Sequence, residues 1–170
     1  GKHRKAVGLR ELPGDTSQGV VLRFAPNPNG PLTLGHSRGV AINSEYARVY
    51  DGKVVLRFDD TDTKVKPPIP DAYDWIADEY EWLAGNPADI VIRASDRMPV
   101  YLEHAERMIA GGFGYVCRCS SVSFRNLRED KQDCPCRGKD ATESLSDWKA
   151  MNAGEIEEGD AVVRVRTEMT

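Results

Sequence analysis

The chain lacks any long apolar run. No part of its 170 residues approaches the roughly 18 to 20 consecutive apolar residues of a membrane span. The N-terminal segment GKHRKAVGLREL has no apolar core of the kind that defines a secretory signal. These two absences predict a soluble protein of the cytoplasm, with no membrane partner.

An excess of positive charge is also missing. The 23 basic and 27 acidic residues give a formal net charge of −4. No global positive field therefore attracts a polyanion, and any contact with nucleic acid must come from a local patch. Apolar residues make up 40% and charged residues 29% of the chain, which excludes a collagen-like or wholly disordered protein and predicts a folded core.

Two kinds of pattern alternate along the first 112 residues. Short apolar runs rich in β-branched residues alternate with segments in which apolar residues recur at helical spacing. This order predicts an α/β fold with a Rossmann-like, doubly wound parallel sheet. Ligands of such sheets bind beyond the carboxyl ends of the strands. The expected strands are 20–24, 53–58 and 89–94, and the expected helices are 35–50, 73–83 and 100–109.

The loop after the first expected strand has the composition of an anion site. It joins a strand to a helix start, where backbone N–H groups of the first turn are free to face a phosphate. Gly30 and Gly35 permit tight turns and a close approach of backbone to ligand. His36 lies just inside the helix and can donate a hydrogen bond to a phosphate or pack on a purine, although a lone histidine at this position is more often structural.

Acidic residues follow the second expected strand. Asp59, Asp60 and Asp62 end the segment VLRFDDTD. Asp60 and Asp62 are interpreted first as turn and helix-start residues. A further acidic set, expected to form the solvated face of helix 73–83, consists of Asp74, Asp78, Glu79 and Glu81.

The stretch LRFAPNPNGPLTLGHSRG at 22–39 closely resembles the first signature of the class I aminoacyl-tRNA synthetases of the glutamyl and glutaminyl group. In that family an RFxPxPxG strand end leads into the tetrapeptide HIGH. The segment VLRFDDTD at 55–62 is similar to the second strand of the same family and its acidic end. HIGH falls on residues 33–36, with Thr33 where the first histidine is usual, and a threonine hydroxyl is a weaker, neutral donor.

The resemblance implies a HIGH-type nucleotidyltransferase half that activates glutamate with ATP and Mg²⁺ and transfers it to the 3′ end of tRNA. Arg23 would then hold the glutamate side chain and Asp59 its α-amino group, with Ala25 and Asn27 beside them. Without the two motifs, an ion pair at the strand ends would be the preferred interpretation of Arg23 and Asp59. The implied ATP-binding residues are Pro28, Gly30, Thr33, Gly35 and His36, of which Thr33 and His36 are the catalytic candidates.

The finer features of these blocks favour glutamate over glutamine. Glutaminyl members commonly read FDDTN, whereas Asp62 gives FDDTD here. The sequence before the first strand and the FAPNPNG form look like the archaeal and eukaryotic branch. A single archaeal enzyme of this kind often glutamylates two tRNAs, so tRNA(Glu) and tRNA(Gln) both stay open as partners.

The four cysteines form two Cys-x-Cys pairs separated by fourteen residues, Cys117 and Cys119, then Cys134 and Cys136. In a chain without an export signal, reduced thiols or metal ligands are favoured over disulfides. Four thiolates at this spacing can surround a structural Zn²⁺. Four free thiols are the alternative. The basic residues around the pairs, which fit tRNA contact or a solvated surface, are Arg118, Arg125, Arg128, Lys131, Arg137 and Lys139.

These observations predict three segments. Residues 1–18 form a linker or extension, 19–112 the half-domain for ATP and glutamate, and 113–170 the truncated start of an acceptor-stem insert with a zinc knuckle. A short helix near 144–152 and a strand at 161–166 are expected in the last. No KMSKS-type loop occurs, so the chain alone is expected not to charge tRNA. The alternatives are a glutaminyl or other HIGH-type enzyme, and a non-catalytic zinc-containing RNA-binding module.

Overall fold

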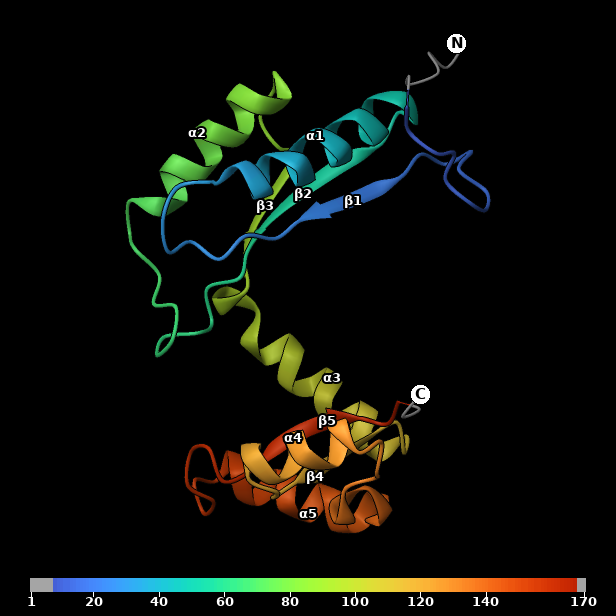
Figure 1. Ribbon diagram of the computed structural model, residues 1–170, viewed down its shortest axis with the longest axis vertical. Helices are drawn as coiled ribbons and strands as arrows, with labels where there is room; N and C mark the ends of the chain where they lie inside the picture. The colour runs from blue at the N-terminus through green and yellow to red at the C-terminus, as the bar shows by residue number, and fades with distance from the viewer. Residues whose placement is uncertain (1–7, 168–170) are drawn as a thin grey trace. The chain divides into compact units, whose positions relative to one another are not determined.

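The computed structural model describes residues 8–167, and within it the chain divides into two compact units (Figure 1). The first unit ends at Arg97 and the second begins at Met98. The sequence places its functional boundary at 112/113, fifteen residues later, so the intervening helix belongs to the second compact unit. None of the described helices is long and apolar enough to cross a bilayer.

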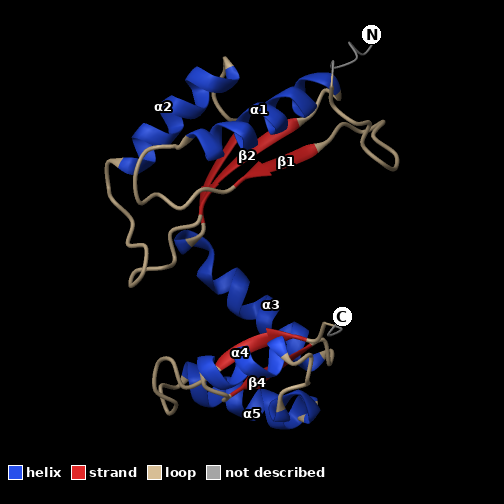
Figure 2. Cartoon of the chain, viewed as in Figure 1, coloured by secondary structure: helices blue, strands red, loops and turns tan. Residues whose placement is uncertain are grey.

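The first unit is built on a parallel three-stranded sheet in the order β1-β2-β3 (Figure 2). The strands are β1 (Val21–Phe24), β2 (Lys53–Phe58) and β3 (Ile90–Arg93), and they are connected by α1 (Leu34–Val49) and α2 (Ala72–Ala84). The predicted α/β fold with a parallel sheet is confirmed, and each expected strand and helix of this unit is present within one or two residues of its expected bounds.

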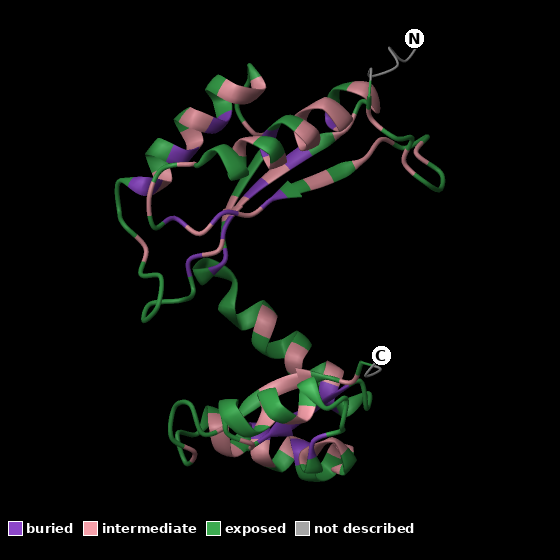
Figure 3. Ribbon diagram, in the orientation of Figure 1, coloured by how far each residue is buried: buried purple, intermediate pink, exposed green. Residues whose placement is uncertain are grey.

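The core of the first unit lies between one face of the sheet and the two helices (Figure 3). Side chains alternate between the faces of a strand, so Phe24, Leu56 and Phe58 point toward the helices. On the opposite face Val21 is 73% exposed. The helical residues buried in this core are Val40 and Ala47 of α1 and Ile76 and Tyr80 of α2.

The segment expected to be a linker is partly attached to the first unit. The hydroxyl of Tyr46 donates to the carbonyl of Arg10 at 2.8 Å, and the hydroxyl of Tyr50 accepts from the N–H of Leu12 at 3.0 Å. Residues 10–12 therefore lie against the last two turns of α1. The basic start of the chain, residues 2–5, lies outside the described residues.

The second unit pairs two antiparallel strands with three helices. In chain order these elements are α3 (Met98–Ala110), β4 (Gly114–Cys117), α4 (Ser121–Glu129), α5 (Ala141–Asn152) and β5 (Val162–Val165). The expected helices at 100–109 and 144–152 and the strand at 161–166 are confirmed. Two short 3-10 helices, η1 (Ser95–Arg97) and η2 (Pro135–Gly138), complete the described structure.

Strand β4 and helix α4 were not predicted, and their environment explains why. All four residues of β4 are buried, so the strand shows no alternation of apolar and polar residues. Val116 packs into a cluster with Ile109 and Trp148, whereas Tyr115 and Cys117 face a separate cluster that contains the other cysteines. Helix α4 has no fully buried residue, and its N-cap, Ser120, accepts a hydrogen bond from the N–H of Ser123.

Asp60 is a buried structural residue, so the expectation that it starts a helix or a turn is wrong. Its carboxylate accepts hydrogen bonds from the Tyr73 hydroxyl at 2.8 Å and from the Ser95 N–H and hydroxyl at 2.8 and 2.7 Å. Burial disfavours the charged form, but these hydrogen bonds outweigh it and hold the pKa of Asp60 below its usual value. Asp62 does form the expected turn, because it accepts from the N–H groups of Lys64 and Val65.

Substituting Asp60→Asn is expected to lower the free energy of unfolding by about 1–3 kcal/mol, because an amide nitrogen then faces hydrogen-bond donors. The comparison variant Asp78→Asn, an exposed position on α2, is expected to change it by less than ~0.5 kcal/mol. Urea unfolding followed by circular dichroism measures both. Equal effects of the two substitutions would contradict the structural role of Asp60.

The stabilising effect of Asp60 is expected to depend on pH, which the comparison of the unmodified chain with Asp60→Asn measures. The pKa of Asp60 is lower in the folded than in the unfolded chain, where it lies near ~3.9, so its contribution is complete above that pH. The contribution is lost as the pH falls through the folded pKa. The stability difference between the unmodified chain and Asp60→Asn is therefore expected to narrow as the pH falls below about 3.9.

Candidate active site

The loops that follow β1 and β2 are joined by their backbones. The N–H of Asp59 donates to the carbonyl of Pro26 at 2.9 Å, and the side-chain amide of Asn27 donates to the carbonyl of Asp59 at 2.8 Å. The N–H of Ile69 donates to the carbonyl of Pro28 at 2.8 Å. The loops of the two sequence blocks are therefore hydrogen-bonded to each other at the carboxyl edge of the sheet, where ligands of α/β folds bind.

Charged side chains gather at this edge. Arg23 of β1 is paired with Val55 of β2, which places Arg23 on the same face of the sheet as Arg57. Arg57 forms an ion pair with Asp59, at 2.6 Å between Nη2 and Oδ1. None of the described residues forms an ion pair with Arg23, so its exposed guanidinium is available to an anion.

Arg57 was not among the residues predicted from the sequence. The available signal was its position two residues before Asp59, because residues two apart point to the same face of an extended chain. A second polar group is also unmatched here. The Oδ1 atom of Asn27 is buried and accepts no hydrogen bond from the described residues, so it can accept one from a bound ligand.

The start of α1 presents His36 in a defined tautomer. Thr33 is the N-cap residue, and its backbone N–H donates to Nδ1 of His36 at 3.0 Å. Because Nδ1 accepts this hydrogen bond, the proton of the neutral ring lies on Nε2. The ring is exposed and meets the edge of Phe24 at a centroid separation of 6.4 Å. His36 therefore offers an outward N–H donor at the N-terminus of a helix.

The glycines of this loop are not required by its backbone conformation. Neither Gly30 nor Gly35 has a positive φ, so neither position needs glycine for its backbone conformation. A Cβ atom on Gly30 would meet nothing within 4 Å, and one on Gly35 would meet only the Thr33 hydroxyl at 3.6 Å. The protein itself thus has room for a side chain at both positions, which leaves open space on the outer side of the loop.

Glu79 of α2 holds the loop from the other side. Its Oε2 atom accepts a hydrogen bond from the N–H of Leu32 at 2.6 Å, and the residue is half-buried. The expectation that Glu79 belongs to a solvated face is therefore wrong, whereas Asp74, Asp78 and Glu81 are exposed as expected. A carboxylate directed at a backbone N–H fixes the loop just before the helix begins.

Three of the four cysteines form one cluster in the second unit, and Cys136 lies at its edge, next to Cys119. The sulfur atoms of Cys117, Cys119 and Cys134 all lie within 4.8 Å of one another. The Sγ atoms of Cys119 and Cys136 are 3.9 Å apart, and those of Cys117 and Cys134 are 3.8 Å apart. Burial and the neighbouring thiols raise the pKa of Cys119 to about 12. No pair of these cysteines is joined as a disulfide.

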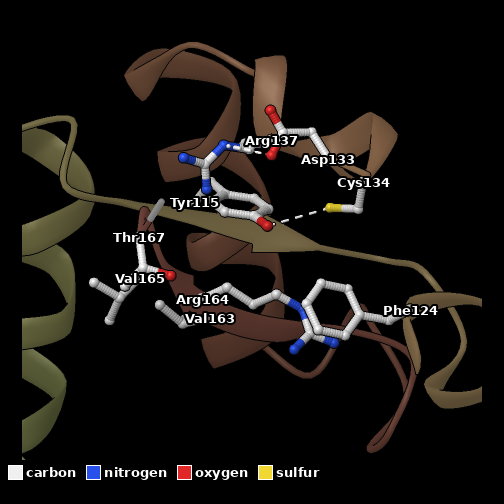
Figure 4. A pocket seen from close by; sticks show the side chains of 9 residues that line it. All are labelled: Tyr115, Phe124, Asp133, Cys134, Arg137, Val163, Arg164, Val165 and Thr167. Carbon is white, nitrogen blue, oxygen red and sulfur yellow. Dashed lines mark hydrogen bonds and ion pairs between the residues drawn. The ribbon is translucent and has the colours of Figure 1, made fainter. Parts of the chain in front are cut away.

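A hollow of about 280 Å³ lies beside Cys134 (Figure 4). The hydroxyl of Tyr115 points to the sulfur of Cys134 at 3.2 Å, and the guanidinium of Arg164 stacks on the ring of Phe124 at 3.3 Å. These aromatic contacts enclose one side of the cysteine cluster in apolar and cationic groups.

The basic residues around the knuckle divide into two sets. Arg118 and Lys139 both bind Asp147, at 2.7 and 2.5 Å, and Arg137 binds Asp133 at 3.1 Å. These three cations therefore share two carboxylates, so their charge is partly balanced. The exposed residues for which the described part of the chain gives no ion pair are Arg125, Arg128 and Lys131.

The fold and the two linked loops are those of an α/β protein with a candidate ligand site at the carboxyl edge of a parallel sheet. Residues 19–170 match the family described as tRNA synthetases class I (E and Q), catalytic domain. The chain therefore belongs to this family.

Archaeal proteins share about half of the sequence. The chain is 50% identical over 162 residues to the glutamate-tRNA ligase of Methanosarcina mazei, which covers 95% of the chain and 28% of that protein. It is 46% identical over 168 residues to that of Thermococcus kodakarensis, which covers 99% of the chain and 29% of that protein. The chain thus spans less than a third of the length of these curated relatives.

A solved structure agrees with the fold. The crystal structure of a glutamate tRNA ligase from Elizabethkingia meningosepticum, in complex with its amino acid, superposes with a TM-score of 0.57. It covers 86% of this chain and 32% of the other chain at 24% identity. At this identity the likeness supports the class I synthetase fold and no residue role.

Removing the anchor of the loop is expected to loosen it. In Glu79→Ala the amide of Leu32 loses its acceptor, and a hydrogen bond to a charged group contributes roughly 1.5–3 kcal/mol. Hydrogen exchange at Leu32 is expected to accelerate by at least about tenfold. The comparison variant is Glu81→Ala, which removes an exposed carboxylate two residues away. An unchanged exchange rate in Glu79→Ala would show that this hydrogen bond does not hold the loop.

Proposed function

We propose that the chain is part of a glutamate-tRNA ligase, which activates glutamate with ATP and transfers it to the 3′ end of tRNA. The observation that carries the proposal is the joining of the two signature loops at one sheet edge by hydrogen bonds from Asp59 to Pro26 and from Asn27 to Asp59. This junction supports a site in which the start of α1 and the residues at the strand ends act together on an acidic amino acid.

Glutamate presents two carboxylates and one ammonium group, and the sheet edge has partners for them. The guanidinium of Arg23 suits the side-chain carboxylate, because its planar fork can bind both oxygens. Asp59 suits the ammonium group. Asn27, whose buried Oδ1 accepts nothing from the described residues, and the neighbouring backbone at Ala25 complete the proposed amino-acid site.

ATP is proposed to lie with its phosphates at the N-terminus of α1. An oxygen of the glutamate α-carboxylate attacks the α-phosphorus of ATP. The bond from the α-phosphorus to the oxygen that bridges it to the β-phosphorus breaks, and pyrophosphate leaves together with Mg²⁺. Negative charge that develops on the phosphoryl oxygens is stabilised by donors already in place, which are the backbone N–H groups of the first turn and Nε2 of His36. The remaining residues proposed to bind ATP are Pro28, Gly30, Thr33 and Gly35.

Thr33 has a second role in this proposal. As the N-cap it orients His36 through its backbone N–H, and its hydroxyl lies 3.2 Å from Nδ1 of the same ring. The residue that replaces the usual first histidine therefore positions the second one. The open space at Gly30 and Gly35 admits phosphate oxygens close to the backbone.

A structural Zn²⁺ is proposed for the second unit. Sulfur atoms around a tetrahedral zinc with Zn–S bonds of ~2.3 Å lie about 3.8 Å apart. Two of the observed separations have this value, 3.8 Å for Cys117 and Cys134 and 3.9 Å for Cys119 and Cys136. Cys136 lies outside the group of three thiols that are within 4.8 Å of one another, so it would have to move closer to bind the same ion. Cys117, Cys119, Cys134 and Cys136 would hold the ion. Four thiolate ligands leave no open position for a substrate, so the ion would stabilise the fold and take no part in the reaction.

The remaining assignments follow from the same proposal. Residues 19–112 would bind ATP and glutamate, and 113–170 would begin the part that contacts the tRNA acceptor end through Arg125, Arg128 and Lys131. The proposed partners are tRNA(Glu) and, as a second substrate to be tested by charging assays, tRNA(Gln). The cytoplasm is the proposed location, because the partners are the tRNAs of protein synthesis.

The activity is tested by glutamate-dependent exchange of pyrophosphate into ATP, measured on the whole protein. His36→Ala is expected to slow exchange by at least about tenfold, or ~1.4 kcal/mol in the barrier, because a donor to the transition state is lost. The control is His104→Ala, which removes an exposed histidine from α3. Absence of any glutamate-dependent exchange in the unmodified protein would overturn the proposed function.

The zinc proposal is tested by metal content and stability. We expect one zinc per chain in protein never exposed to a chelator. Removing it is expected to cost at least ~2 kcal/mol and to lower the melting temperature of the second unit by about 10 °C. Added zinc should reverse the change in the unmodified chain and fail to do so in Cys134→Ser. A correctly folded sample without zinc would contradict the proposal.

A further inference from the structure

The ion pair between Arg57 and Asp59 is the closest contact between charged groups at the candidate active site. Nε of Arg57 donates to Oδ1 of Asp59 at 2.7 Å, and Nη2 lies 2.6 Å from the same oxygen. Both donors therefore converge on one carboxylate oxygen. The other oxygen, Oδ2, receives neither of these contacts. The Asp59 side chain is 42% exposed.

The sheet determines the positions of Arg57 and Asp59. Arg57 is the second-last residue of β2, and its partner on β3 is Ile92. Asp59 comes two residues later, where its backbone N–H is already fixed by the carbonyl of Pro26. The main chain of Asp59 is thus held by the loop after β1, and Arg57 is the described residue that fixes its carboxylate.

Stability does not account well for such a pair. Exposed ion pairs contribute about 0–1 kcal/mol, and Asp59 remains substantially open to water. A second arginine–carboxylate ion pair lies at the other end of α1, where Nε of Arg48 donates to Oε2 of Glu45 at 2.8 Å and Nη2 lies 2.5 Å from Oε1. Its arginine is more exposed than Arg57, at 51% against 23%, its carboxylate is slightly less exposed than Asp59, at 36% against 42%, and the pair lies away from the strand ends. It is a natural control.

We propose that Arg57 is a positioning residue for the amino-acid substrate. By holding Oδ1 of Asp59, it fixes the rotamer of the carboxylate and leaves Oδ2 to accept a hydrogen bond from the substrate ammonium group. This inference rests on the proposed function, in which Asp59 binds that group. Arg57 acts on the substrate only through Asp59, so its loss affects amino-acid binding and not ATP binding.

The test uses glutamate-dependent pyrophosphate exchange by the whole protein, with KM measured separately for glutamate and for ATP. In Arg57→Ala, the KM for glutamate is expected to rise at least about tenfold, while kcat and the KM for ATP stay within about twofold. Arg57→Lys should recover part of the loss, because an ammonium group can replace one of the two contacts. Arg48→Ala should match the unmodified protein.

Three results would overturn the inference: an Arg57→Ala protein that behaves like Arg48→Ala, one in which kcat and both KM values change together, or no recovery in Arg57→Lys. If Arg57→Ala does not fold, Arg57→Lys decides. A raised KM for glutamate alone supports the inference, and any other outcome rejects it. Asp59→Asn separates the two levels of the argument, because unchanged glutamate-dependent exchange in that variant removes Asp59 from the proposed site, whatever Arg57 does.

Discussion

The parallel pairing of β1 with β2 is the constraint on which the candidate active site depends. The register sets Arg23 beside Val55, so both strands end at one edge of the sheet. The hydrogen bond from Asp59 to Pro26 continues this pairing past the strands and into the loops. A one-residue slip would turn every side chain of one strand to the other face and separate Arg23 from Arg57.

The sequence was most informative where burial is one-sided, so that buried and exposed residues recur at the period of a strand or a helix. Strand β2 was predicted with its observed bounds, and α2 shows its buried residues Ile76 and Tyr80 at helical spacing. The site region was predicted as two loops at strand ends, because their proline, glycine and acidic residues interrupt both patterns. Their joining by backbone hydrogen bonds could not be predicted, because main-chain contacts carry no residue signature.

The residues that were missed or misinterpreted are those whose partners lie on another element. Glu79 has the sequence environment of a solvated charge, and only the fold brings Leu32 to it. Asp60 looked like a turn residue, and its partners Tyr73 and Ser95 come from α2 and η1. In the second unit, α4 packs on the cysteine cluster and buries no residue fully, so apolar periodicity could not reveal it.

The hydrogen bond between Glu79 and the loop has an evolutionary consequence. It joins a side chain to a main-chain N–H, which any residue except proline can donate. The side chain of Leu32 packs on the core of the first unit, so the identity of residue 32 depends on that packing and not on Glu79. The hydrogen bond alone would therefore produce no covariation between positions 32 and 79. Contact inference from coevolving pairs would overlook this link between α2 and the loop.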